Sequence, residues 1–295
     1  MARIARRANG SVKLAVVGAD NVIAPMINYT EQVRRLMSDI VSRVPRLSFL
    51  DMNRVLVFAR SGRADREGPY ATCHCVCLPP SDPGYYFWRD QTTGALTRRS
   101  EWFVTKSPVV RVGTAQIDYM VSFTLPRFCD QRRISARKRA RYRGHPEWMA
   151  KLDTIIHELY HIDPHQPGIR RIERADGTPS TKCHSPAFFQ DVVEMVTQYL
   201  TSSPDPEMLE FLRYDFAGLT ARYGGVVATT FKGASYPRRY MEVLRPQPAA
   251  PDLECPVEPL DLPRSASHFT EEDLVVRRFR TATSRDLPKG KVRAA

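Results

Sequence analysis

The segment His157-Glu158-Leu159-Tyr160-His161 decides how the rest of this 295-residue chain is interpreted. In a helix, side chains at positions i and i+4 project from the same face, so His157 and His161 can both reach one metal ion. Glu158 lies beside them, where its carboxylate can reach a water molecule on that ion. Two histidines and a glutamate in this H-E-x-x-H spacing are typical of helices that hold a catalytic zinc ion. The spacing therefore predicts one Zn²⁺ ion, with Glu158 as the catalytic residue.

The neighbouring residues support a helix at this segment. Pro146 suits a first helical position, and Glu147 places negative charge where the helix dipole favours it. Apolar residues then recur at intervals of three and four and form one stripe, made by Trp148, Leu152, Ile155, Ile156 and Leu159. Asp163 precedes Pro164 and is therefore disfavoured in the helical region. We expect the histidine pair near the C-terminal end of the helix, where the helix opens into a loop.

A catalytic zinc ion usually has three protein ligands, so a third is expected. The best candidate is His184, because Ser185 can cap and Pro186 can open a second helix directly after it. An apolar face on that helix can pack against the first helix, and it consists of Phe188, Val192, Met195, Val196 and Tyr199. Three rival ligands remain open, namely His165, Cys183 and Glu194.

This order of features resembles the minimal zincin peptidases related to the SprT-like proteins. The closer resemblance is to the phage metallopeptidase family, which is similar in its amphipathic N-terminal helix, its strands and its His-Glu-Leu-x-His-Ile segment. The resemblance covers about residues 29–200. It implies a minimal zincin fold with Glu158 as the catalytic carboxylate and with three zinc ligands, His157, His161 and His184. No pair of C-x-x-C motifs follows the second helix, so the zinc ribbon of a full SprT-like protein is not expected.

The ligand set predicts a zinc-dependent metallopeptidase that acts on a protein or peptide substrate. Three neutral imidazoles leave the zinc ion its full positive charge, which lowers the pKa of a zinc-bound water to about 7. Glu158 would accept a proton from this water and pass it to the departing amine. Tyr119, Tyr160 and Tyr199 are open as donors to the oxyanion. Two alternatives stay open: a zinc hydrolase of a non-peptide substrate, and a zinc-stabilised nucleic-acid-binding or interaction protein without hydrolytic activity.

The apolar pattern predicts an α+β domain with an N-terminal helix and a small mixed or antiparallel sheet. The expected elements are a helix over 30–44, strands over 55–60, 71–78 and 117–125, and hairpins over 85–104, turning near Thr93-Gly94, and over 168–182. The strand over 117–125 is the last one before the motif helix. By analogy with other zincins, we expect it to be the edge strand that lines the cleft.

Composition divides the chain into four parts. Residues 1–28 are a basic N-terminal extension, and residues 29–203 are the zincin-like metallopeptidase domain. Residues 204–244 are an accessory segment that can add a strand over 226–231. Residues 245–295 are expected to be a Pro-rich linker and a basic tail, largely irregular and mostly disordered, with a brief helix over 269–279.

The net charge of +12 is concentrated at the two ends and in one internal run. Seven basic residues and no acidic residue lie between Arg132 and Arg143, directly before the motif helix. Such a run can hold the phosphate backbone of a nucleic acid, or it can form a solvated helix face. Nucleic acid is therefore a candidate partner through residues 132–143.

Six cysteines do not make a disulfide framework in a chain of this length. Cys73, Cys75 and Cys77 alternate along one strand about 6.5 Å apart, too far to share a zinc ion, so we expect core thiols with His74 on the opposite face. A reducing, cytoplasmic location fits this use of cysteine. No stretch has the length of a membrane span, and the apolar run over 14–19 is too short for a signal peptide.

Overall fold

The computed structural model describes residues 26–62, 68–77, 85–86, 103–130, 136–173, 183–233, 235–238, 240–243 and 265–281. The helices are α1 (Tyr29–Arg43), α2 (Arg127–Asp130), α3 (Ala136–Arg141), α4 (Trp148–Tyr160), α5 (Pro186–Thr201), α6 (Pro206–Glu210) and α7 (Phe216–Tyr223). The strands are β1 (Ile27–Asn28), β2 (Val55–Gly62), β3 (Ala71–Cys75), β4 (Tyr85–Tyr86), β5 (Phe103–Val112), β6 (Ala115–Ile117), β7 (Tyr119–Pro126), β8 (Val226–Phe231), β9 (Tyr240–Val243), β10 (Ser265–Phe269) and β11 (Leu274–Phe279). The chain therefore has the mixed α+β composition that its apolar pattern predicts.

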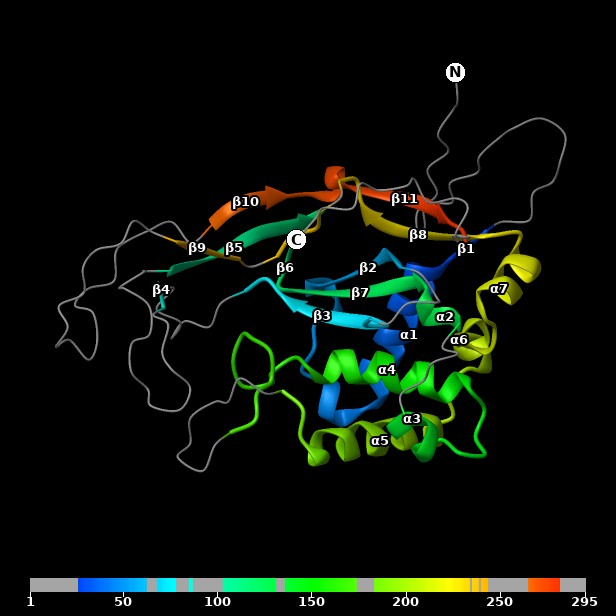
Figure 1. Cartoon of the computed structure of the whole chain (residues 1–295). Coiled ribbons are helices and arrows are strands. Elements are labelled where there is room, and N and C mark those ends of the chain that lie inside the picture. The colour runs from blue at the N-terminus through cyan, green and yellow to red at the C-terminus, as the bar shows by residue number, and fades with distance from the viewer. Residues whose placement is uncertain are drawn as a thin grey trace, which may run out of the picture.

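These elements form three layers (Figure 1). The sheet β2-β7-β3 lies in the middle, with α1, α4 and α5 on one side. On the other side lie the sheet β1-β8-β11 and the sheet β10-β5-β4, in which β6 and β9 also pair with β5. The middle sheet is thus covered on both faces, and the helical face is the one that carries the histidine motif.

The N-terminal helix α1 is built as its sequence predicts. The side chain of Asn28 caps it by accepting a hydrogen bond from the backbone N–H of Glu31 (3.3 Å). One face is buried against the middle sheet and α4, through Val33, Leu36, Met37, Ile40 and Val41. Pro45 follows the last turn and cannot donate an N–H to extend it.

Strand β7 is the centre of the middle sheet. It pairs with β2 in parallel and with β3 in antiparallel orientation, and all eight of its residues are buried. Val121 and Phe123 belong to the core shared with the helices, whereas Met120 belongs to the core between the sheets. The predicted edge position of this strand is wrong, because a strand that is apolar on both faces is stable only where both faces are covered. Among the described strands, β2 and β3 lie at the two edges of this sheet.

The C-terminal segment forms strands instead of the brief helix predicted over 269–279. All six residues of β11 pair with β8, and β10 pairs with β5. Helical structure is limited to the 3₁₀ turn Glu271–Asp273, which Thr270 caps. Val275 and Val276 are β-branched and favour the strand that follows. The largely irregular tail predicted for residues 245–295 is therefore wrong over 265–281, and the rest of that segment lies outside the described residues.

The other predicted elements agree with the structure where it describes them. The strands expected over 55–60 and 226–231 correspond to β2 and β8, and the one expected over 71–78 begins as β3. Antiparallel pairing of β4 with the start of β5 agrees with the hairpin over 85–104, although its turn near Thr93-Gly94 lies outside the described residues. Most of the hairpin predicted over 168–182 and the N-terminal extension over 1–25 also lie outside the described residues.

Helices α6 and α7 were not predicted, although aspartates mark their starts. Asp205 and Asp215 accept hydrogen bonds from backbone N–H groups at the starts of these helices.

Among the described residues, none of the helices is long and apolar enough to cross a membrane.

The core between the sheets can be tested with two Phe→Ala changes. Phe58 is 1% exposed and contacts Phe231 edge to face at 5.2 Å, whereas Phe49 is 41% exposed. We expect Phe58→Ala to lower the free energy of unfolding by about 3–5 kcal/mol, because it removes a buried ring and leaves a cavity. The control, Phe49→Ala, should change it by less than about 0.5 kcal/mol in the same urea titration. Equal effects of the two changes would contradict the described layering.

Candidate metal centre

His157 and His161 lie at the C-terminal end of α4. The backbone N–H of His161 donates to the carbonyl oxygen of His157 (3.2 Å) and continues the helical pattern to the second histidine. Four apolar residues fix the helix against the core, namely Leu152, Ile155, Ile156 and Leu159, all fully buried. The helix begins at Trp148, two positions after Pro146, whose carbonyl oxygen accepts from the N–H of Met149 (3.0 Å). The two rings are therefore held one helical turn apart at an end that opens into a loop.

His184 is placed by the start of α5. The hydroxyl of Ser185 accepts a hydrogen bond from the backbone N–H of Phe188 (3.0 Å), and Pro186 occupies the first turn. Helix α5 packs along α4, and the Tyr160 hydroxyl donates to Asp191 across the contact (2.7 Å). The residue directly before α5 is thereby brought over the last turn of α4.

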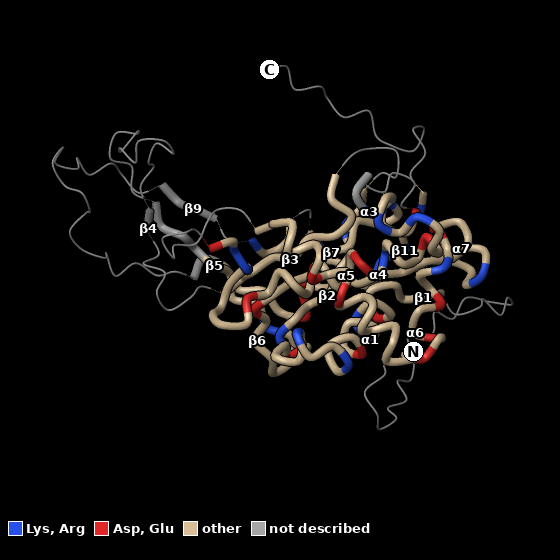
Figure 2. Tube along the Cα trace, turned by 90° about the horizontal axis from the view of Figure 1, so that it is seen from below, with Lys and Arg blue, Asp and Glu red and all other residues tan. Residues whose placement is uncertain are grey.

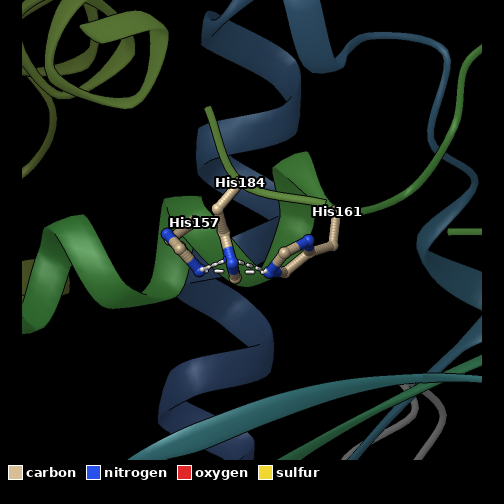
Figure 3. A group of neighbouring side chains, drawn as sticks. All are labelled: His157, His161 and His184. Carbon is tan, nitrogen blue, oxygen red and sulfur yellow. Dashed lines mark hydrogen bonds between the residues drawn. The ribbon is translucent and has the colours of Figure 1, made fainter. Parts of the chain in front are cut away.

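The three imidazole rings point at one common centre from two separate segments (Figure 3). Each pair of Nε2 atoms among His157, His161 and His184 is 3.1 Å apart. Zinc–nitrogen bonds of about 2.0–2.1 Å at tetrahedral angles place neighbouring ligand nitrogens about 3.3 Å apart, so the spacing fits one zinc ion. Hydrogen bonds among the three rings do not explain this arrangement. An Nε2–H bond lies in the plane of its ring and points at the common centre, and therefore not at the neighbouring Nε2 atom. The three histidines therefore form a group that could hold a metal ion.

The three histidines of the group differ in how far they are exposed. His161 is buried, His157 is half-buried and His184 is exposed. Burial, with repulsion from His184 and Arg170, lowers the pKa of His161 to about 4, so this ring is neutral at pH 7. A neutral imidazole offers the lone pair that a metal needs. His184 thus lies on the exposed side of the group.

Aromatic side chains hold the rings in place. The Phe188 ring lies 5.1 Å from the rings of His157, His161 and His184, and Phe189 stacks on His184 at 5.3 Å. The Nδ1 atom of His161 is buried without a hydrogen-bond partner in the described part of the chain. Metal-ligating histidines usually donate this second N–H to an oxygen, whereas the described contact of the His161 ring is with the Phe188 ring.

Glu158 joins the helix to the edge of the middle sheet. Its Oε2 atom accepts a hydrogen bond from the backbone N–H of Cys73 in β3 (2.7 Å), and the side chain is buried. Burial raises the pKa of Glu158 to about 7, while the Cys73 N–H and the charges of Lys138 and Arg60 act in the opposite direction. The structure therefore places, one residue from His157, a carboxyl group that can exchange a proton near neutral pH.

The rival ligands lie outside the histidine group. Within the described residues, His157, His161 and His184 form the group that could hold a metal ion. His165 is exposed in the loop, where its backbone N–H donates to Asp163 (2.8 Å). Glu194 is exposed and pairs with Arg46 (3.3 Å), and Cys183 is half-buried. The structure thus brings together the three histidines that the sequence pattern selected.

The three candidate tyrosines hold structural hydrogen bonds. Tyr160 donates to Asp191 (2.7 Å) and Tyr199 donates to Asp39 (2.6 Å), so both hydroxyls join helices. The Tyr119 hydroxyl accepts the backbone N–H of Gly168 (2.9 Å) in the loop after His161. None of these three bonds aims a hydroxyl at the histidine group, and the oxyanion donor is left without an assignment.

Within the basic run over 132–143, Lys138 and Tyr142 bond to the motif helix. Lys138 in α3 forms an ion pair with Asp153 (2.7 Å) and donates to the Thr154 hydroxyl (2.5 Å), and Tyr142 donates to Asp153 (2.8 Å). Basic and acidic positions are interspersed along the described trace (Figure 2). The side chain of Lys138 is thus bonded to residues of α4. Nucleic-acid binding by the rest of the run stays a prediction.

Comparison with known proteins finds no match: no family model matches the chain, no curated protein matches its sequence and no solved structure matches it. The function must therefore be argued from the geometry of the site.

Removal of one histidine tests whether the cluster is a metal site. We expect His161→Ala and His184→Ala each to weaken zinc binding at least about 100-fold, since even changes outside the ligand shell cost 10–100-fold. Competition with a chromogenic chelator measures the affinity. His165→Ala is the matched control and should bind zinc like the unchanged protein, because His165 lies in the exposed loop. An equal loss in the control would contradict the ligand assignment.

Proposed function

We propose that this protein is a zinc-dependent metallopeptidase in which His157, His161 and His184 hold one zinc ion and Glu158 is the catalytic residue. The convergence of three Nε2 atoms at mutual distances of 3.1 Å is the observation that carries the proposal. When bound there, a zinc ion supplies positive charge that polarises a carbonyl group and makes water more acidic. The chain supplies the proton transfer, the orientation of the rings and the surface for the substrate.

Glu158 has the properties of a general acid and base. Its pKa of about 7 lies where a carboxyl group can both take up and release a proton under neutral conditions. The hydrogen bond from the Cys73 N–H holds one carboxylate oxygen, Oε2, and we propose that the other, Oε1, exchanges the proton. In peptide hydrolysis, Glu158 would take a proton from the attacking water and deliver it to the nitrogen of the departing amine.

The number of ligands favours catalysis over a structural role. Structural zinc sites are closed by four protein ligands, whereas catalytic sites have three and keep a position for water or substrate. The described residues supply three histidines here, with His184 on the exposed side. A zinc-stabilised binding protein is therefore the weaker alternative.

Strand β3 supports a peptide as the substrate. It is an edge strand among the described strands and lies against α4. An extended peptide can pair with such an edge through main-chain hydrogen bonds. The motif helix, the second helix and this edge strand together support the minimal zincin fold of the phage metallopeptidase family, with β3 in the place that the sequence pattern had assigned to β7.

Glu158→Gln separates the enzyme from a zinc-stabilised binding protein. We expect the variant to keep its zinc, because the ligands are unchanged and the glutamine oxygen can still accept from Cys73. Its rate of cleavage of an unfolded protein substrate should fall by about 10²–10⁴-fold, because the amide cannot accept a proton. Cleavage is followed by gel electrophoresis and metal content by atomic absorption.

Glu147→Gln is the matched control, since Glu147 is exposed just before the same helix. It should cleave at the unchanged rate. Addition of a chelator should abolish cleavage by the unchanged protein, and added zinc should restore it. Cleavage that survives both the chelator and Glu158→Gln would overturn the proposal.

A further inference from the structure

Two cysteines lie in contact at the end of β3. The Sγ atoms of Cys75 and Cys77 are 3.3 Å apart, and the Cys75 thiol also donates to the carbonyl oxygen of Cys77 (3.0 Å). The two sulfurs are closer than the spacing of about 6.5 Å expected for an extended strand, because β3 ends at Cys75 and Cys77 lies beyond it. Cys75 is buried and Cys77 is half-buried, so a small reagent can reach the pair at Cys77.

The surroundings of Cys77 favour its thiolate. Hydrogen bonds from the Cys75 thiol and from the Tyr119 hydroxyl lower the pKa of Cys77, although burial and Asp118 act against this. The thiolate is the form that attacks disulfides. Cys73 differs, because burial, followed by the charges of Glu158 and Cys77, raises the pKa of its thiol. One activated thiol, that of Cys77, thus lies just beyond the end of β3 with a second thiol in contact.

The same pair is joined to the loop beside the metal centre. Tyr119, which lies opposite Cys75 in the pairing of β3 with β7, accepts the backbone N–H of Gly168 (2.9 Å). The carbonyl oxygen of Gly168 accepts from the N–H of Asp163 (3.2 Å), and the N–H of Arg170 donates to the carbonyl oxygen of His161 (2.7 Å). Strand pairing and hydrogen bonds therefore connect the end of β3, where the thiols lie, to the loop that begins at His161.

We propose that Cys75 and Cys77 are a dithiol site that low-molecular-weight disulfides convert reversibly into an intrachain disulfide. The Cys77 thiolate attacks one sulfur of the small disulfide, whose S–S bond breaks and releases one thiolate. Cys75 then gives its proton to the released small thiolate and attacks the Cys77 sulfur, and the second small thiolate leaves as the mixed S–S bond breaks. The two cysteines lose two electrons in total, and the small disulfide gains them. The sulfurs need to approach only from 3.3 Å to a bond length of about 2.05 Å.

Formation of this disulfide alters the metal centre. The two sulfurs must move together to form the bond, which shifts the end of β3 where Cys75 lies opposite Tyr119 and thereby shifts the Tyr119 ring. The contact with Gly168 then loosens the loop after His161. This second step rests on the proposed metal site, whereas formation of the disulfide does not.

The first test uses the full chain and glutathione disulfide. The protein is oxidised, unfolded, labelled with N-ethylmaleimide, digested and analysed by mass spectrometry. We expect Cys73 to be labelled while Cys75 and Cys77 are joined and unlabelled, and dithiothreitol to restore both labels. Cys77→Ser should leave Cys75 open to labelling, and the control Cys183→Ser should form the same linkage as the unchanged chain. Label on both Cys75 and Cys77, or glutathione retained on Cys77, would overturn the site.

The second test compares zinc affinity before and after oxidation. Chelator competition should show binding at least about 10-fold weaker in the oxidised protein, the smallest loss typical of changes around metal ligands. The same treatment of Cys77→Ser should leave its affinity unchanged. Equal affinity in the two states of the unchanged protein would overturn the link to the metal centre. A reduced protein that binds no zinc would instead refute the proposed function, with the labelling result unaffected.

Discussion

The packing of α4 between the middle sheet and α5 is the constraint on which the rest of the structure depends. The buried apolar stripe of α4 fixes its rotation about its own axis. Because the histidines lie four residues apart, that rotation also fixes the direction of both rings. Helix α5 can reach the third position only by lying along α4, and the bond between Tyr160 and Asp191 joins the two helices. The site is therefore a product of core packing.

Much of this site could be predicted because its signals are local. The H-E-x-x-H spacing, the apolar stripe and the Ser185-Pro186 helix start each act within one or two helical turns. The same is true of α1, whose period of 3.6 residues is unbroken. Local patterns of this kind predict that an element exists and which face it buries. These local patterns predict His184 as the third ligand without any information about which strands pair.

The errors concern contacts between segments far apart in the sequence. The position of β7 between β2 and β3 depends on which strands pair. The apolar sequence of a strand does not indicate which strands lie beside it. The strands β10 and β11 pair with residues much earlier in the chain, which no local pattern indicates. The backbone N–H of Cys73 reaches Glu158 across a long sequence separation, and a backbone group has no sequence signature. The contact of Cys75 with Cys77 follows from the point at which β3 ends, and the ends of elements are poorly predicted from sequence.

The strands β10 and β11 also constrain the order in which the molecule can be assembled. Ser265 pairs with Ser107, and β11 lies beside β8 on the side opposite β1. The outer layer therefore closes only after a large part of the chain has been synthesised. Contacts of such high sequence separation require the closure of long loops before they contribute any stability, and proteins rich in them fold slowly. The contact of α4 with α5, in which Tyr160 donates to Asp191 31 residues later in the chain, is more local and can form while the outer face of the middle sheet is still uncovered.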